Sequence, residues 1–251
     1  MSTKSSQPVP PLPWLLVAVE REHLFFRRRC EILETLRRDP INAWRCRVGQ
    51  RDFILAETGV GGDSVRRTLD WLRTVAPPAS AIFAGFCGAL VDDLRVGDAV
   101  WADAVVDGAG QTWVNDFRGF EAQGRSSLGF RRGRIITSDH LVDTGEAKRD
   151  LAAKSGAIVV EMESSYFAEW CRVHEVPWGC LRVVSDDART NVSKDVFDLL
   201  EGGRVSPWRL MRGIVRRPSL IGDLLHLRKA TNHAASVIDA AFAEIMAQPR
   251  R

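Results

Sequence analysis

The sequence predicts an α/β protein, on three observations. Apolar runs of strand length alternate with segments whose apolar residues recur every three or four positions. The clearest case is the unit 158–184, in which a strand, a helix and a second strand follow directly on one another. Third, 45% hydrophobic and 27% charged residues in a chain of 251 residues describe a globular protein with a full core.

The elements follow from these patterns in chain order. Residues 1–13 are rich in Ser and Pro and are expected to be a disordered leader before one domain, 14–251. The expected strands are 14–19, 45–48, 53–57, 80–84, 99–106, 111–117, 129–136, 158–160 and 178–184. The expected helices are 24–38, 65–75, 146–155, 164–174 and 220–246.

Acidic residues follow several of the predicted strands. Glu161 and Glu163 come after the strand 158–160, and Ser185 and Asp186 come after the strand 178–184. Ligands of open α/β sheets bind at this edge, and two separated carboxylates there suit one group that holds a hydroxyl and another that exchanges a proton. The alternative is a surface unit whose acids are solvated.

The same residues carry a family resemblance. The run Val160-Glu161-Met162-Glu163, followed by Arg182 and then Ser185-Asp186, resembles the signature of the nucleoside phosphorylase and nucleosidase superfamily, and most closely the 5'-methylthioadenosine/S-adenosylhomocysteine nucleosidases. The resemblance implies a three-layer α-β-α sandwich with a mixed, partly barrel-like sheet. It also implies that Met162 packs on the ribose, Glu163 holds the ribose hydroxyls and Asp186 is the acid at N7 of the purine. Ser185 and Arg182 would position that loop, and Glu161 would join the substrate-binding residues.

The first predicted strand ends in Ala18-Val19-Glu20-Arg21-Glu22, which is similar to the A-x-E-x-E pattern of the nucleosidases. The resemblance places Glu22 as the general base for water. The alternative is a helix N-terminus whose acids favour the helix dipole.

Two glycine-containing turns complete the resemblance on this side of the sheet. The segment 58–62 contains Gly59 and Gly61 and is similar to the turn that lines the ribose and nucleophile pocket. The segment 85–90 begins with Gly85, and its small residues would let the backbone approach the purine and sugar. Phe86 and Cys87 depart from the usual small pair, so Phe86 is either a specificity residue or a core residue.

The base-binding segment also departs from the family pattern. In 138–142, Leu141 stands where the nucleosidases have an aromatic ring, and Val142 follows it. An aliphatic side chain can still sandwich adenine, with stacking weaker by about 1 kcal/mol. This departure leaves the identity of the base open.

Composition excludes several classes of function. A net charge of +3 is too small to indicate nucleic-acid binding, and no run approaches the roughly 20 apolar residues of a membrane span. Five cysteines without a CxxC pair are typical of reduced, mostly buried thiols in a cytoplasmic protein. We expect no metal and no cofactor.

The C-terminal part has its own features. The segment 204–217 is a basic, Trp-containing amphipathic helix that suits either peripheral membrane contact or a solvated or dimer-facing position. The run after it, beginning Arg216-Arg217-Pro218-Ser219-Leu220, resembles the hopanoid-associated branch, whose nucleoside substrate would be adenosylhopane.

The expected reaction is hydrolysis of the N-glycosidic bond of a purine nucleoside, with adenine as the expected base. Phosphorolysis remains open, because Arg21 and the loop 59–62 could attract phosphate. A nucleoside-binding protein without turnover is the third hypothesis. A homodimer is implied by the family resemblance.

Overall fold

The computed structural model describes residues 10–115, 117, 129–189 and 220–247, without the side chains of 220–227. Within these ranges the strands form one mixed sheet of ten. The strands are β1 Leu12–Val17, β2 Glu31–Arg38, β3 Ile41–Val48, β4 Arg51–Glu57, β5 Pro78–Ala89, β6 Ala99–Val106, β7 Thr112–Val114, β8 Arg131–Thr137, β9 Val159–Glu161 and β10 Trp178–Asp186. The helices are η1 Glu20–Glu22, α1 Leu24–Arg27, α2 Gly62–Val75, α3 Gly145–Ser155, α4 Ser164–Val173 and α7 Leu220–Ala247.

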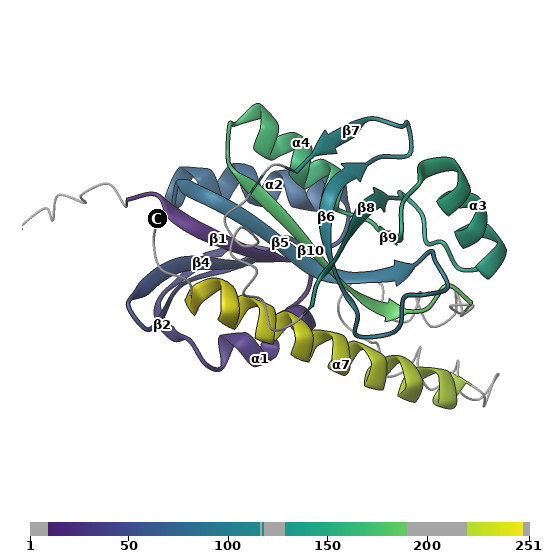
Figure 1. The fold of residues 1–251 in the computed structure, drawn as a ribbon. Coiled ribbons are helices and arrows are strands. Elements are labelled where there is room, and N and C mark those ends of the chain that lie inside the picture. Colours follow the sequence, from purple (N-terminus) through teal and green to yellow (C-terminus); the bar gives the residue numbers. More distant parts are fainter. Residues whose placement is uncertain (1–9, 116, 118–128, 190–219, 248–251) are drawn as a thin grey trace, which may run out of the picture.

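Part of the sheet closes on itself. The strand order is β10-β6-β8-β9-β5-β1-β4-β3-β2, and β10 also pairs with β5. The closed part consists of β10, β6, β8, β9 and β5. The twelve-residue strand β5 also pairs with β1, the first strand of an open wing made by β1, β4, β3 and β2 (Figure 1). This confirms the predicted mixed, partly barrel-like sheet.

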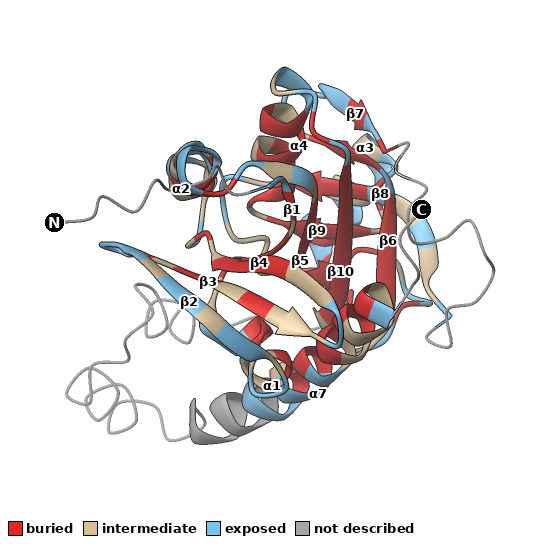
Figure 2. Cartoon of the chain, turned by 90° about the vertical axis from the view of Figure 1, so that its left-hand side faces the viewer, coloured by how far each residue is buried: buried red, intermediate tan, exposed pale blue. Residues whose placement is uncertain are grey.

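Helices cover both faces of the sheet, which confirms the three layers. On one face, α2 and α4 pack against the sheet through apolar side chains that include Leu69, Leu72 and Phe167. On the other face, α7 and α1 contribute Phe242 and Phe26, whose rings lie 5.2 Å apart. The central strands β1, β5 and β10 are almost entirely buried (Figure 2).

The long C-terminal helix α7 also braces the segment that follows β1. Arg21 of η1 donates a hydrogen bond to Asn232 at 3.0 Å, and Arg29 pairs with Asp239 at 3.1 Å. None of the described helices has an apolar stretch long enough to cross a bilayer. The basic segment 204–217 lies outside the described residues, so its contact with membranes stays a prediction.

The predicted helix 24–38 is wrong. Only Leu24–Arg27 is helical, and Glu31–Arg38 forms the edge strand β2, which pairs antiparallel with β3 through a turn at Asp39-Pro40. The apolar spacing fits a helix, but sheet pairing overrides that local preference. The mostly exposed, charged β2 is suited to an edge because charged side chains discourage pairing with other chains (Figure 2).

The other boundaries shift by smaller amounts. β1 begins at Leu12, inside the predicted leader, and β5 runs on to Ala89 where a strand ending at 84 was expected. The extension matters for the site, because it brings the segment 85–88 into the sheet beside β10.

Candidate active site

The predicted site residues lie at one edge of the sheet, where parallel strands end. β1, β5 and β10 run parallel to one another, so their carboxyl ends meet there. Glu22 lies in η1 directly after β1. Glu161 ends β9, which runs antiparallel to β5 and approaches the same region from the other direction. Arg182 and Asp186 lie on β10, opposite Gly85 and Gly88 of β5.

Arg182 is the centre of this region. It is fully buried, and its Nη2 lies 2.6 Å from Oε2 of Glu161. The hydroxyl of Ser164 accepts hydrogen bonds from its Nε and Nη2 at 3.1 and 2.8 Å. Its guanidinium lies 4.5 Å from the ring centre of Phe83. Burial lowers the pKa of Arg182, but the neighbouring carboxylates outweigh this and raise it above its usual value.

Glu161 is committed to this network. Its carboxylate accepts the backbone N–H groups of Glu163 and Ser164 and the hydroxyl of Thr137, in addition to the ion pair with Arg182. These partners use the oxygens of a carboxylate that is 6% exposed. Glu161 therefore holds the arginine and the start of α4 in place, and this arrangement does not favour the substrate-binding role expected for it.

Glu22 is fixed beside Arg182. Its Oε2 accepts the backbone N–H groups of Ala18 and Val19 at 2.7 and 3.0 Å, and its Oε1 accepts that of Phe86 at 2.8 Å. Burial raises the pKa of Glu22, although the charge of Arg182 and these hydrogen bonds oppose the shift. A raised pKa makes a carboxylate a stronger base, so a rigidly held one is suited to take a proton from a bound group.

Gly85 is where Glu22 and Arg182 meet. A Cβ atom at this position would lie 2.1 Å from Nη1 of Arg182 and 2.8 Å from Oε1 of Glu22. The same Nη1 is buried and has no hydrogen-bond partner among the described residues. A side chain at position 85 would thus displace the guanidinium of Arg182 and the carboxylate of Glu22. With glycine there, both groups approach the same point beside the backbone.

Glu163 joins the group from the N-terminus of α4. Its Oε1 accepts the backbone N–H of Gly61 at 3.0 Å, in a turn where Gly59 and Gly61 have φ of +77° and +84°. Burial, and then the charge of Glu161, raise the pKa of Glu163 to about 7, against the opposing effect of Arg182. Glu22, Glu161 and Glu163 therefore all interact electrostatically with the guanidinium of Arg182, and the glycine turn binds Glu163.

Asp186 lies further along β10, four residues after Arg182. A register shift between Val184 and Asp186 makes a bulge at Ser185, and a bulge re-aims the side chain that follows it. Oδ2 of Asp186 lies 2.5 Å from Nζ of Lys148, and the Ser185 hydroxyl lies 3.1 Å from Oδ1. No hydrogen bond among the described residues connects Asp186 directly to Glu22 or Glu163.

Of the remaining predicted site residues, some pack in the hydrophobic core and others are partly exposed near the acidic segments. Phe86 is partly buried and packs against the apolar cluster under α7, in addition to presenting its N–H to Glu22. Cys87 is buried, and burial raises the pKa of its thiol well above the usual value, so it is an inert thiol. Val142 packs with a small apolar cluster that includes Leu90 and Ile136. Met162 and Leu141 are partly exposed next to the acidic segments, and their contacts with a substrate stay predictions.

The sequence predicts no role at the site for Lys148, although its segment 146–149 is part of the resemblance to the hopanoid-associated branch. It lies in α3, which the pattern predicts as a short polar helix, and nothing in the spacing separates it from the other lysine of that helix, Lys154. Its complete burial distinguishes it.

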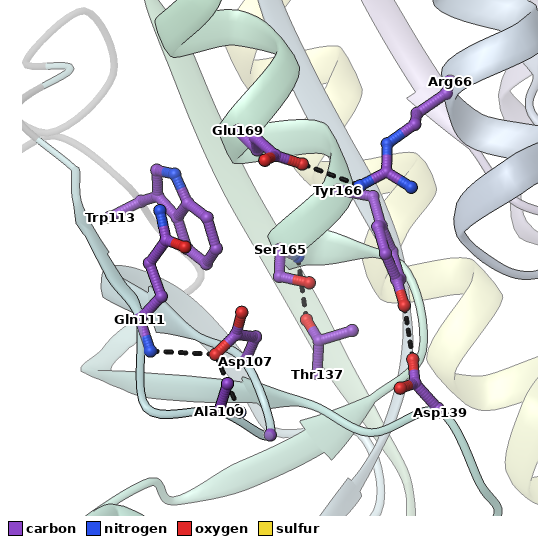
Figure 3. A pocket seen from close by; sticks show the side chains of 11 residues that line it. Arg66, Asp107, Ala109, Gln111, Trp113, Thr137, Asp139, Ser165, Tyr166 and Glu169 are labelled. Atoms are coloured by element: carbon purple, nitrogen blue, oxygen red, sulfur yellow. Dashed lines mark hydrogen bonds and ion pairs between the residues drawn. The ribbon is translucent and has the colours of Figure 1, made fainter.

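A cavity of about 220 Å³ lies beside this region (Figure 3). Its wall includes Thr137, whose hydroxyl donates to Glu161 on the other side, and Tyr166, whose hydroxyl donates to Asp139. That hydrogen bond and burial raise the pKa of Tyr166 to about 12. Arg66 pairs with Glu169 and lies over the Tyr166 ring, while Asp107 accepts the backbone N–H groups of Ala109 and Gln111.

A partly closed mixed sheet that carries buried ionisable groups near the ends of its strands is typical of an α/β enzyme. The sequence model of the phosphorylase superfamily matches residues 16–127 and 111–201. The chain belongs to this superfamily. The assignment predicted from the motifs, a nucleosidase or nucleoside phosphorylase, is confirmed at this level.

Several known proteins are similar to this chain in sequence or in fold. A 5'-methylthioadenosine/S-adenosylhomocysteine nucleosidase from Tolumonas auensis is 24% identical over 209 residues, which cover 74% of this chain and 91% of that protein. The crystal structure of the Neisseria meningitidis enzyme of the same name, in complex with methylthio-immucillin-A, has a TM-score of 0.73 at 19% identity and covers 93% and 97% of the two chains. The futalosine hydrolase of Helicobacter pylori has a TM-score of 0.70 at 17% identity, with 93% and 98% covered.

Proposed function

We propose that this enzyme hydrolyses the N-glycosidic bond of a purine nucleoside and releases adenine. One observation carries the proposal. Two buried carboxylates, Glu22 and Glu163, both interact electrostatically with Arg182, which lies on the same strand as Asp186. This set provides a base, a group for the sugar and an acid in one region.

Glu163 is the group that holds the sugar. Gly61 engages its Oε1, and the ionised carboxylate accepts hydrogen bonds from the 2' and 3' hydroxyls. Fixing the sugar in this way favours the positive charge that develops at C1' as the bond to the base breaks.

Glu22 is the base that takes a proton from the attacking water. The water is held between its carboxylate and Nη1 of Arg182, two groups that converge at Gly85. This Nη1 has no hydrogen-bond partner in the part of the chain that the structure describes. Asp186 protonates N7 of the purine, which makes the base a neutral leaving group. Each proton-transfer role is worth about 10²–10⁴ in rate.

The local charge favours water over phosphate as the nucleophile. Three carboxylates interact electrostatically with one guanidinium, and an anion would meet their repulsion before it reached C1'. Phosphorolysis remains the second candidate because Arg182 Nη1 and the glycine turn 59–61 are donors that a phosphate could use. The relatives named above are two nucleosidases and a hydrolase, which supports hydrolysis.

The proposal also covers the group that the nucleoside substrate carries at its 5' position. Methylthioadenosine and S-adenosylhomocysteine are the first candidates, because the nucleosidase relatives carry those names. Adenosylhopane is a third, and it rests on the resemblance of the run that begins at Arg216, most of which lies outside the described residues. Homodimerisation and peripheral membrane contact remain predictions of the same resemblance and of the basic segment 204–217.

Product analysis tests the proposal. Purified protein is incubated with methylthioadenosine, S-adenosylhomocysteine, inosine and an adenosine that carries a lipid at the 5' position, with and without phosphate. We expect adenine and the free sugar, with loss of activity in Asp186→Asn and no loss in Asp150→Asn, a change at an exposed acid of α3. Release of sugar 1-phosphate would establish phosphorolysis, and binding without release would indicate a nucleoside-binding protein.

A further inference from the structure

We propose that Lys148 is a positioning residue for departure of the base, and that it acts through Asp186. The inference rests on the proposed function, because it assumes that Asp186 exchanges a proton with the leaving purine. It adds a residue from α3 to a site otherwise built from strand ends and the turns that follow them.

The contacts of Lys148 are directed at the end of β10. Its side chain has 0% exposure, whereas that of Asp186 has 17%. Nζ donates to Oδ2 of Asp186 at 2.5 Å and to the backbone carbonyl of Asp187 at 2.8 Å. One ammonium therefore fixes both the acid and the backbone immediately after it.

The position of α3 is suited to this contact. Thr144 caps the helix by accepting the N–H of Ala147, and Gly145 approaches the turn after β10 so closely that a Cβ would lie 3.3 Å from the carbonyl of Ala188. A buried ammonium is costly unless it is paired and hydrogen-bonded. The helix places this lysine where both conditions are met, while Lys154 at the other end of α3 is exposed.

Other groups complete the clamp around Asp186. Ser185 provides a hydroxyl to Oδ1, and a Cβ on Gly88 would lie 2.9 Å from Oδ2, so β5 closes the other side. The ammonium also balances the negative charge that Asp186 carries once its proton has passed to N7, near a region where Glu22, Glu161 and Glu163 already share one arginine. Without Lys148, the carboxylate would be free to turn toward solvent.

A comparison of two leaving groups in the full-length chain tests the role. Methylthioadenosine needs protonation of its base, whereas a 4-nitrophenyl 5-methylthioribofuranoside releases a phenolate that needs no acid. We expect Lys148→Met to lower kcat on methylthioadenosine about 100-fold, because misplacement of a catalytic group by about 1 Å costs that much. KM, and turnover of the nitrophenyl substrate, should stay within about threefold of the unchanged protein.

The double variant decides whether Lys148 acts through Asp186. If it does, Lys148→Met together with Asp186→Asn is no slower than Asp186→Asn alone. Lys154→Met is the matched control and should leave both reactions unchanged. Should Lys148→Met fail to fold, Lys148→Gln, which keeps a donor without the charge, is expected to give the same pattern.

Two results would overturn the role of Lys148 and leave the proposed function intact. One is a double variant whose loss of kcat is the product of the two single losses, and the other is a Lys148→Met variant that loses kcat equally on both substrates. Failure of the unchanged protein to cleave any adenosine derivative would instead overturn the proposed function, and this inference with it.

Discussion

Arg182 and Glu161 form an ion pair in which both side chains are almost completely excluded from water, at 1% and 2% exposure. Removing one partner of such a pair leaves the other as an uncompensated buried charge, which costs far more than the pair contributes.

Glu161→Gln is therefore expected to lower the free energy of unfolding by about 3–5 kcal/mol. Urea denaturation of both proteins at pH 7 measures the difference. Glu146→Gln, at an exposed position of α3, is the control and should change stability by less than about 0.5 kcal/mol. If both variants lost a similarly small amount of unfolding free energy, the burial of the Arg182–Glu161 pair would be contradicted.

The raised pKa of Glu163 predicts a pH-dependent contribution to stability. Its carboxyl has a pKa of about 7 in the folded protein, against an ordinary value of 4.5 in the unfolded chain. Between these pH values the folded state holds a proton that the unfolded state has lost. The stabilising contribution is therefore complete below about pH 4.5 and is lost as the pH rises through 7.

Comparison with Glu163→Gln isolates this effect from other titrating groups. From pH 4.5 to pH 7, the unchanged protein should lose at most about 3 kcal/mol of unfolding free energy relative to the variant. Parallel curves for the two proteins over this range would show that Glu163 titrates normally.

The Lys148–Asp186 pair predicts an asymmetry between two substitutions. Asp186→Asn removes the counter-charge of an ammonium with no exposure and should cost about 3 kcal/mol. Lys148→Met fills a similar volume with apolar atoms and leaves a carboxylate that can reach water, so it should cost only about 1 kcal/mol. Urea unfolding of the two variants gives the order, and the reverse order would contradict the assigned burial.

Gly85 predicts a loss of activity without any change of a charged residue. Gly85→Ala places a methyl group against Arg182 and Glu22, and we expect kcat to fall by about 100-fold or more. Overpacking should also lower stability by about 1–3 kcal/mol. Gly108→Ala is the control, because a Cβ there meets nothing within 4 Å. Equal activity of the two variants would show that the space between Arg182 and Glu22 does not hold the attacking water.

The sequence predicts the central strands and the carboxylates after them well, because both signals are local. A buried strand is a run of apolar residues, and an acid that follows it must lie at the sheet edge. In the structure Glu22 follows β1, Glu163 follows β9 and Asp186 is the last residue of β10, but β9 runs antiparallel to β5, which the strand-helix-strand pattern did not predict. Their roles in catalysis stay predictions.

What the sequence could not show depends on packing between distant segments. The segment 31–38 has helical spacing, and its pairing with β3 is a tertiary choice that no local pattern reports. The burial of Lys148 arises because α3 meets the end of β10, 38 positions away. Arg182 was expected only to position a loop, and its place among three carboxylates depends on three separate strand ends meeting.

The brace between α7 and the turn of Glu22 has a consequence for synthesis of the protein. Asn232 supports Arg21 from 211 positions later in the chain. Segments near the N-terminus emerge from the ribosome and begin to fold first, so a nascent chain can build β1 and its neighbours long before this support exists. We therefore expect stalled chains that end before residue 220 to contain a loosely held Glu22, and the enzyme to become competent only once the last helix has docked.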